Sequence, residues 1–279
     1  MIKTSELHRI AALEGIRFDQ IEKDYIILWI LYALSQPDFV PEGWAFKGGT
    51  CLRHCYYPGY RFSEDLDFSC EPGERGLDNA LVLLEQVAAW IQGTSGILMN
   101  TKPHQSGGGD FQVEIPVEYN RGGLRRQKLP YVKIHLTFDE SILTEMVTCS
   151  VKPRYPDLSD FVINAYSKEE VIAEKMRALL QQQNKWPRPR DLFDLWFILC
   201  RSEEQFEPNR LKDIFIQKCR VRQIEPDMAG LISEKLREWN KGAWGNQLGP
   251  LMKNVPDFEE VWQEWVTTFH GIFGENNSI

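Results

Sequence analysis

Residues 46–68 read FKGGTCLRHCYYPGYRFSEDLDF. This segment follows the apolar residues Trp44 and Ala45, passes through a Gly-Gly turn and ends in alternating acidic and apolar residues. Apolar runs and alternation are typical of strands, whereas glycine pairs are typical of turns. The segment therefore predicts a strand that ends near Phe46, a turn, a short helix, a loop and a second strand that carries Asp65 and Asp67.

The two aspartates of the second strand are two positions apart. Successive side chains of a strand point to opposite faces, so Asp65 and Asp67 share one face and Leu66 and Phe68 share the other. Carboxylates about 6–7 Å apart repel each other unless a cation lies between them. Mg²⁺ commonly binds one or two carboxylates together with substrate phosphates. The pair predicts a site for Mg²⁺ or Mn²⁺; the alternative is a strand face with solvated acids.

The turn before the short helix is the second chemical signal. A Gly-Gly turn at a helix N-terminus allows backbone N–H groups to approach a phosphate, with help from the helix dipole. An ordinary tight turn is the alternative. The residues expected to hold a phosphate here are Lys47, Gly48, Gly49 and Thr50.

A GG(S/T) turn followed by a DxD strand resembles the signature of the polymerase β-like nucleotidyltransferase fold. More narrowly, residues 46–68 resemble the AbiEii/AbiGii-type nucleotidyltransferase toxins of bacterial toxin–antitoxin and phage-defence systems. The resemblance continues in IEKDYIILWILYAL (21–34), YSKEEVIAEKMRALL (166–180) and PRPRDLFDLWFIL (187–199). It spans about residues 20 to 200.

The resemblance implies Mg²⁺-dependent transfer of a nucleoside monophosphate from an NTP to a hydroxyl. Asp65 and Asp67 would hold the metal ions, the turn would hold the triphosphate, and Arg61 and Ser63 would contact its phosphates. The expected acceptor is RNA, namely the 3′ end of tRNA, and the expected partner is an antitoxin encoded nearby. Two alternatives stay open: a transferase acting on a small molecule or protein side chain, and a degenerate module that binds nucleotide or a partner without catalysis.

The resemblance also maps catalytic residues onto the two downstream blocks. Lys175 falls within the apolar face of a helix predicted over 168–182, where a lysine either extends its ammonium to solvent or reaches a site. Asp191 and Asp194 lie one turn apart on the next helix. Either of them is a candidate for the functional aspartate, and Asp191 is equally suited to cap its helix. We expect Lys175→Ala to be tolerated by the fold, because it removes a charge rather than core volume.

One feature departs from the general nucleotidyltransferase pattern. Such enzymes generally supply a third carboxylate from a later strand to deprotonate the attacking hydroxyl. In YVKIHLTFDE (131–140) the corresponding position holds His135, which has an ordinary pKa near 6.5 and is a candidate base. The acids that are alternatives to it are Glu114, Glu118 and Asp139.

Two groups of basic residues flank the proposed site in an otherwise acidic chain of net charge −8. Local basic patches in an acidic protein suggest a polyanionic acceptor, and solvated charged loops are the alternative. The first group lies in the loop at 120–130 and the second precedes Asp191. Their members are Arg121, Arg125, Arg126, Lys128, Lys185, Arg188 and Arg190.

The chain has 279 residues, of which 43% are hydrophobic and 26% charged, and this excludes a disordered or low-complexity protein. We expect an α+β fold: a polymerase β-like core with a mixed sheet over residues 1–160, and a helical domain over 161–279 that completes the active-site cleft. The predicted elements are a helix at 19–35 with Asp19 as N-cap, a turn at 71–76, a helix at 77–92, strands at 111–119 and 131–138, and a final amphipathic helix near 258–269.

The N-terminus lacks the apolar region of a signal peptide, and the longest apolar run is about half of a bilayer span. A cytoplasmic protein without a membrane partner is expected. The six cysteines form no CxxC pair, so we expect reduced packing residues. Cys51, His54 and Cys55 lie close in sequence, but no second ligand cluster follows to complete a zinc site.

Overall fold

The computed structural model describes residues 1–70, 76–106, 112–122, 128–183 and 185–274. The chain divides into two compact units, Met1–Tyr166 and Ser167–Ile279. The first unit contains the sheet, and the second is helical. Each unit is described on its own below.

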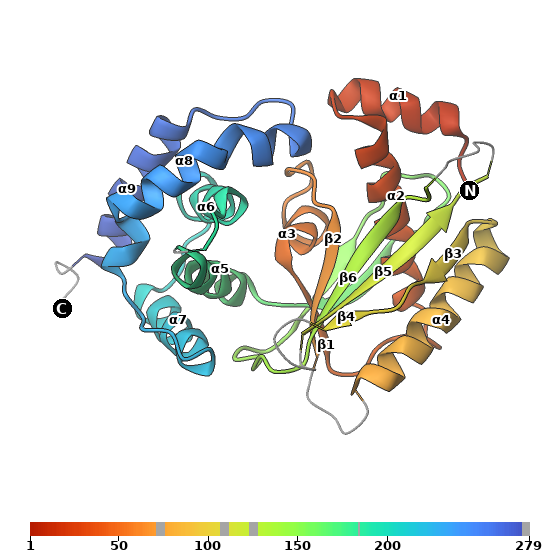
Figure 1. Ribbon diagram of the computed structural model, residues 1–279, viewed down its shortest axis with the longest axis horizontal. Coiled ribbons are helices and arrows are strands. Elements are labelled where there is room, and N and C mark those ends of the chain that lie inside the picture. The colour runs from red at the N-terminus through yellow and green to blue at the C-terminus, as the bar shows by residue number, and fades with distance from the viewer. Residues whose placement is uncertain (71–75, 107–111, 123–127, 184, 275–279) are drawn as a thin grey trace. The chain divides into compact units, whose positions relative to one another are not determined.

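A mixed sheet forms the first unit, in the order β3-β5-β6-β2-β1-β8-β7, with β4 paired to β5 (Figure 1). β2 is parallel to β6 and β1 is parallel to β8, whereas the other neighbours are antiparallel. The α+β fold and its mixed sheet are therefore confirmed. The strands are β1 (Trp44–Lys47), β2 (Asp65–Cys70), β3 (Leu98–Thr101), β4 (Gln105–Ser106), β5 (Gln112–Asn120), β6 (Tyr131–Thr137), β7 (Val147–Val151) and β8 (Phe161–Ala165).

Alternation in sequence becomes alternation of burial in the central strands. Ile134 and Leu136 of β6 and Leu66 and Phe68 of β2 are buried, while the residues between them are half-exposed or, like Ser69, buried and polar. One face of the sheet therefore belongs to the core, and the other carries the polar side chains. The predicted strands at 111–119 and 131–138 are β5 and β6, and they pair antiparallel as a hairpin.

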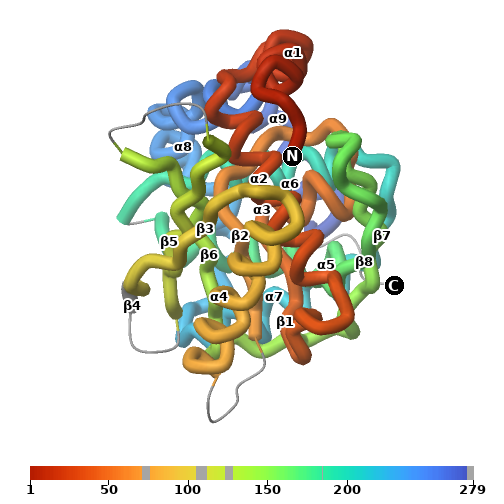
Figure 2. Tube along the Cα trace, turned by 90° about the vertical axis from the view of Figure 1, so that its right-hand side faces the viewer, coloured from red at the N-terminus to blue at the C-terminus, as the bar shows by residue number. Residues whose placement is uncertain are grey.

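The helices of the first unit are α1 (Thr4–Glu14), α2 (Phe18–Leu34), α3 (Gly48–Cys51), the π-helical turn η1 (Leu52–Tyr56) and α4 (Gly76–Ser95). α2 is apolar nearly all round and is almost completely buried, as predicted for residues 19–35. Figures 1 and 2 show α2 and α4 lying side by side along the sheet.

One prediction about the helices was wrong, and another falls mostly outside the described residues. Arg17, not Asp19, is the N-cap of α2; Asp19 lies in the first turn, where its carboxylate accepts hydrogen bonds from Arg17. A carboxylate in the first turn is stabilised by the helix dipole, so the residue serves the helix without capping it. The helix predicted at 77–92 lies within α4, and the turn predicted at 71–76 falls, except for Gly76, outside the described residues.

The second unit contains α5 (Lys168–Gln182), α6 (Pro189–Trp196), η2 (Phe197–Arg201), α7 (Pro208–Val221), η3 (Ala229–Ile232), α8 (Glu234–Leu248), η4 (Gly249–Leu251) and α9 (Phe258–Phe273). α5 has the predicted bounds, and the Ser167 hydroxyl caps it by accepting from the Glu170 N–H. The apolar residues predicted for the final helix are those that α9 buries.

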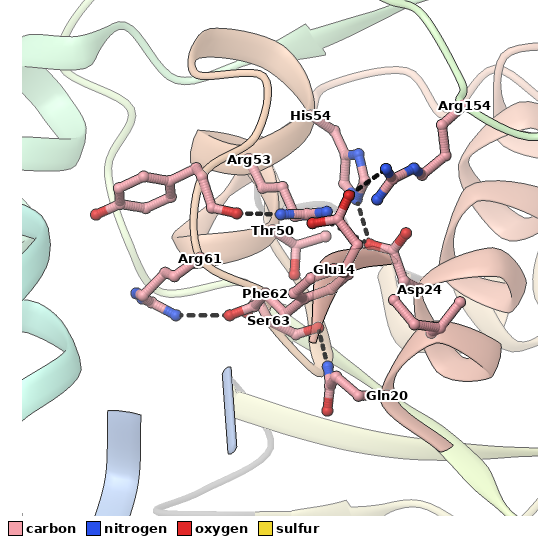
Figure 3. Close-up of polar contacts among 12 residues, drawn as sticks. Glu14, Gln20, Asp24, Thr50, Arg53, His54, Arg61, Phe62, Ser63 and Arg154 are labelled. Carbon is pink, nitrogen blue, oxygen red and sulfur yellow. Dashed lines mark hydrogen bonds and ion pairs between the residues drawn. The ribbon is translucent and has the colours of Figure 1, made fainter. Parts of the chain in front are cut away.

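A buried ionic cluster joins α2 to the segment after the Gly-Gly turn (Figure 3). Asp24 of α2 accepts hydrogen bonds from Arg53 at 3.2 Å and from the Tyr155 hydroxyl at 2.8 Å, and its Oδ1 lies 3.1 Å from His54 Nε2. Burial alone would raise the pKa of the Asp24 carboxyl, but His54, Arg53 and Tyr155 outweigh it and hold that pKa well below its usual range.

All six cysteines are free thiols. Among the described helices, none combines the length and the apolar character that crossing a membrane requires.

We predict that Asp24→Asn lowers the free energy of unfolding by about 3–5 kcal/mol at pH 7, because it leaves buried cationic partners without their carboxylate. A depressed folded-state pKa stabilises the protein above the unfolded pKa, near 4, and this contribution is lost as the pH falls further. Urea unfolding between pH 7 and pH 3 should therefore show the difference between wild type and variant shrinking at acid pH. Asp19→Asn is the control, because the Asp19–Arg17 pair is exposed and should contribute less than about 1 kcal/mol.

Candidate functional site

Four polar residues form a row across four neighbouring strands. The register pairs Lys47 of β1 with Asp67 of β2, Asp67 with His135 of β6, and His135 with Glu114 of β5. Residues directly opposite each other in a sheet share a face. Sheet register therefore gathers side chains that are far apart in the sequence on one polar face.

The two aspartates predicted from the DLD run both lie on this face, half-exposed. Burial and, after it, the negative charge of Asp67 together raise the pKa of the Asp65 carboxyl to about 6. This is the expected effect of like charges held close together with little solvent between them. A cation bound between the two carboxylates would relieve that repulsion.

The Gly-Gly turn lies directly against Asp67. Gly48 has φ +79°, a left-handed conformation that favours glycine, and a Cβ built on it would lie 2.2 Å from Asp67 Oδ2. Since any side chain would displace the carboxylate, only glycine satisfies both the backbone and the space at this position. The turn and the acidic strand are therefore packed together as one site.

The second glycine faces the other two predicted phosphate contacts. A Cβ on Gly49 would lie 2.8 Å from Arg61 Nη2 and 3.0 Å from Ser63 Oγ. Arg61 is buried and donates to the Phe62 carbonyl at 3.0 Å, while Gln20 of α2 donates to the Ser63 carbonyl at 3.2 Å (Figure 3). The turn is thus lined by a guanidinium and a hydroxyl whose backbone is held by α2.

Two other residues of the turn have structural partners. The buried Thr50 hydroxyl donates to the Asp65 carbonyl at 2.5 Å, which ties the short helix to β2. Lys47 Nζ lies 2.6 Å from Glu140 Oε2, and both side chains are almost fully buried. The ammonium also lies 5.5 Å from the centroid of the Tyr166 ring. Both residues therefore lie at the site and make contacts that stabilise the fold.

His135 occupies the position where a third carboxylate was expected. Its Nδ1 lies 2.9 Å from Asp67 Oδ1, and its Nε2 lies 3.1 Å from Glu114 Oε2. Carboxylate oxygens only accept hydrogen bonds, so both ring nitrogens carry hydrogen in this arrangement. Burial opposes the charged ring, but the hydrogen bonds and charges of Asp67 and Glu114 raise the pKa of His135 to about 9. The geometry is that of an imidazolium held between two acids.

The acids named as alternatives to His135 are placed differently. Glu114 lies one strand further from Asp67, where it also accepts from Lys133 at 2.9 Å. Glu118 forms an ion pair with Lys102 at 2.9 Å. Asp139 follows β6 and is half-exposed. Of these three acids, Glu114 is therefore the one connected to Asp67, through the ring of His135.

The donors present fit a divalent metal ion bound together with a nucleotide. Among the residues that the structure describes, no group of three or more His, Cys, Asp or Glu side chains could hold a metal ion alone. Mg²⁺ does not require such a group, because it fills its shell with substrate phosphates and water beside one or two carboxylates. Asp65 and Asp67 supply those two carboxylates, and the missing Cβ of Gly48 leaves room for Oδ2 of Asp67 beside the turn.

The predicted residues of the helical unit form a compact ionic cluster. Lys175 Nζ lies 2.8 Å from Asp191 Oδ1 and 2.7 Å from Asp194 Oδ2, and all three side chains are buried. Burial alone would raise the pKa of Asp191, but Arg188 and Lys175 outweigh it and hold that pKa well below its usual range. Lys175 therefore contacts both candidate aspartates.

This cluster contradicts the expectation that the fold tolerates Lys175→Ala. Removing one partner of a buried ion pair leaves the other charges uncompensated, which costs about 3–5 kcal/mol. Loss of activity in that variant would consequently not distinguish a catalytic role from a structural one.

Of the two described residues in the first basic group, Arg121 does not contribute to a surface patch. The side chain of Arg121 is buried: it donates to the Ile2 carbonyl at 2.6 Å and lies 3.6 Å from Glu22 and over the ring of Tyr25. It therefore stabilises the packing of the N-terminal segment and α2. Arg125 and Arg126 lie outside the described residues, and Lys128 is exposed.

The second group lies in the helical unit, after α5 and at the start of α6. Lys185 is exposed, Arg190 is half-exposed, and Arg188 donates to Asp191.

Three residues that contact the site residues or their neighbours were not identified from the sequence. They are Gln20, which donates to the Ser63 carbonyl, Glu140, which pairs with Lys47, and Lys23, which lies 3.5 Å from Glu64. Gln20 and Lys23 lie in the first turns of α2, which reads in sequence as an ordinary buried helix. The one signal that could have identified them is that they are polar residues in a largely apolar helix.

Comparisons with known proteins identify the family and the fold. The sequence matches the family described as "Nucleotidyl transferase AbiEii toxin, Type IV TA system" over residues 29–265. No curated protein matches in sequence. Among solved structures, the fold is similar to MenT4, a nucleotidyltransferase toxin from Mycobacterium tuberculosis H37Rv, with a TM-score of 0.63, 17% identity and coverage of 96% of this chain and 89% of that one. JHP933 from Helicobacter pylori is similar with a TM-score of 0.62, 21% identity and coverage of 94% and 96%.

The two structural likenesses show the fold, and the sequence match covers most of the chain, including the Gly-Gly turn, both aspartates of β2 and the ionic cluster of α5 and α6. The chain belongs to the AbiEii nucleotidyl transferase toxin family of type IV toxin–antitoxin systems.

Proposed function

We propose that this protein transfers a nucleoside monophosphate from an NTP to an RNA hydroxyl, with Mg²⁺ or Mn²⁺, and that the acceptor is the 3′ end of tRNA. One observation carries the proposal: the Gly48 backbone is packed against Asp67, with Asp65 on the same strand face. This arrangement offers backbone N–H groups for phosphates beside carboxylates for the cation that accompanies them.

The bound metal ion would neutralise charge on the phosphates as the phosphorus–oxygen bond breaks. Asp65 and Asp67 would hold that ion by their carboxylates, and Gly48 and Gly49 would present the turn to the β- and γ-phosphates. The Arg61 guanidinium beside Gly49 stabilises the negative charge that develops on the leaving pyrophosphate. Ser63, on the other side of the same glycine, orients a phosphate oxygen.

His135 acts in this proposal as a positioning residue rather than as the base that deprotonates the acceptor. Both of its nitrogens are engaged with carboxylates, so neither offers a lone pair to the attacking hydroxyl. It fixes Oδ1 of Asp67, while Glu114 fixes the ring from its other side. Asp67 therefore has one oxygen held by the protein and one beside Gly48.

Lys175, Asp191 and Asp194 are proposed to have functional roles, as the family resemblance implies. Their geometry supports a charge-balanced cluster in which Lys175 and Arg188 together neutralise the two acids. Lys47 and Thr50 are proposed to support the turn, through Glu140 and the Asp65 carbonyl, instead of contacting phosphate directly.

An RNA acceptor is supported by the basic residues that are at the surface. Lys128 is exposed beside the hairpin of β5 and β6, and Lys185 is exposed before α6. Cationic side chains of this kind bind a polyanion by neutralising phosphates and releasing counterions. An antitoxin partner follows from the family, and its gene is expected to neighbour this one.

The role of the turn is tested by a pair of glycine variants. Gly48→Ala should weaken metal-dependent NTP binding by about tenfold or more, because the new Cβ must displace the Asp67 carboxylate. Gly59→Ala is a matched control: Gly59 also has a left-handed φ, +84°, but a Cβ there meets no atom within 4 Å. Isothermal titration calorimetry with NTP and Mg²⁺, and again with EDTA, measures both variants.

The expected result is that wild type and Gly59→Ala bind NTP with equal affinity in Mg²⁺ and not in EDTA. Gly48→Ala and Asp67→Asn should bind NTP at least about tenfold more weakly in Mg²⁺. Equal affinity in metal and in EDTA would contradict the site. Equal weakening by the two glycine variants would assign the effect to backbone strain instead of to Asp67.

Toxicity is tested by induced expression in a bacterium that lacks the antitoxin. Growth should slow with the wild type and with Glu118→Gln, which removes a β5 carboxylate paired with Lys102, and should continue with Asp67→Asn. Extracted tRNA should carry extra 3′ nucleotides only in the slowed cultures. Growth arrest by Asp67→Asn with unmodified tRNA would favour the binding-module alternative.

A further inference from the structure

Trp186 is the tryptophan of this chain that is most exposed among the described residues. Its exposed fraction is 58%, whereas six of the nine tryptophans are buried, and the indoles of Trp196, Trp244 and Trp265 donate to partners within the helical unit. Tryptophan carries a large apolar surface that ordinarily gains stability from burial. Trp186 therefore leaves more of its ring surface available to a ligand than Trp239, the other exposed tryptophan of this unit, at 39%.

The backbone that carries this indole is fixed. The N–H groups of Lys185 and Trp186 both donate to the Gln182 carbonyl, at 2.8 and 3.1 Å. The Arg188 N–H donates at 3.0 Å to the amide oxygen of Asn240, which is buried in α8 and donates in turn to the Leu236 carbonyl. Prolines at 187 and 189 restrict φ on both sides of Arg188. The ring is thus presented by a constrained segment and needs little further ordering on binding.

Two cationic residues lie within two positions of Trp186 in the chain. Lys185 is exposed directly before it, and Arg188 is 38% exposed two residues after it. Arg188 also donates to Asp191, so this segment adjoins the Lys175–Asp191–Asp194 cluster to which the family resemblance assigns a functional role. An aromatic face between cationic side chains is the combination that binds single-stranded nucleic acid, with the ring stacking on a base and the cations contacting phosphates.

We propose that Trp186 is a stacking platform for an unpaired base near the 3′ end of the acceptor RNA, with Lys185 and Arg188 contacting the adjoining phosphates. This inference rests on the proposed transfer to RNA and adds the element that selects a single-stranded end. Stacking is tolerant of base identity, because every base has a π face. The platform therefore selects an unpaired end rather than a sequence.

The test measures binding without catalysis. Fluorescence anisotropy in EDTA, with no NTP present, follows a labelled single-stranded oligoribonucleotide and a blunt duplex of the same sequence. Trp186→Ala should weaken binding of the single strand by at least about fivefold and leave duplex binding unchanged. Trp186→Tyr keeps an aromatic face and should stay within about threefold of wild type, whereas Trp186→Leu keeps apolar bulk without that face and should resemble Trp186→Ala.

Circular dichroism establishes that each variant is folded, which is expected because the side chain is exposed. The proposal is overturned if the wild type does not bind the single strand or if Trp186→Ala binds it with unchanged affinity. Either result would favour a protein as the ligand of the exposed ring. Equal loss in Trp186→Tyr also overturns it. Failure of the proposed function is distinguishable, because it appears as absent NTP-dependent extension of RNA whatever the binding result.

Discussion

The contact between the Gly48 backbone and the Asp67 carboxylate is the constraint on which the rest of the site depends. β1 ends at Lys47, directly opposite Asp67 in the antiparallel register, so the chain must turn against that acid. A left-handed φ makes the turn, and the missing Cβ makes room for the carboxylate. Strand register, turn geometry and the position of a candidate metal ligand are therefore determined together.

The surrounding residues hold this contact in place from several sides. His135 fixes the other oxygen of Asp67, and Glu114 fixes His135. The Thr50 hydroxyl joins the short helix to the Asp65 carbonyl, and Asp24 of α2 binds Arg53 and His54 in the following turn. A site built on strands and short tethers keeps its geometry more accurately than one built on a mobile loop. This rigidity suits a reaction whose rate depends on the alignment of phosphates with an attacking hydroxyl.

Much of this arrangement could be predicted from local patterns. Alternation identified β5 and β6, helical spacing identified α5 and α9, and the Gly-Gly and DLD motifs located the turn and the two acids. α1 was not predicted, although Leu7, Ile10 and Ala11 have helical spacing, because its remaining residues are mostly polar. Local patterns report which residues prefer burial, and a short helix with few apolar residues gives a weak signal.

What could not be predicted depends on residues far apart in the sequence. The parallel pairing of β2 with β6 places His135 beside Asp67, across 68 positions. Arg121 looked like part of an exposed basic loop, and its burial depends on the Ile2 carbonyl and Glu22 more than 90 positions away. Lys175 looked like a lysine that could be removed, and its two acids lie on the next helix. Charge at the sequence level does not reveal which partners the fold supplies.

The most direct measurement of the central claim is the fate of each phosphate of the NTP. Purified protein, total RNA and Mg²⁺ are incubated with an NTP labelled at the α-phosphate and, separately, at the γ-phosphate. Transfer of a nucleoside monophosphate predicts that the α label becomes covalently attached to RNA and that the γ label is released in pyrophosphate. Attachment of the γ label to RNA would contradict the account by showing phosphoryl transfer, and attachment of neither label with any of the four NTPs would contradict catalysis on RNA altogether.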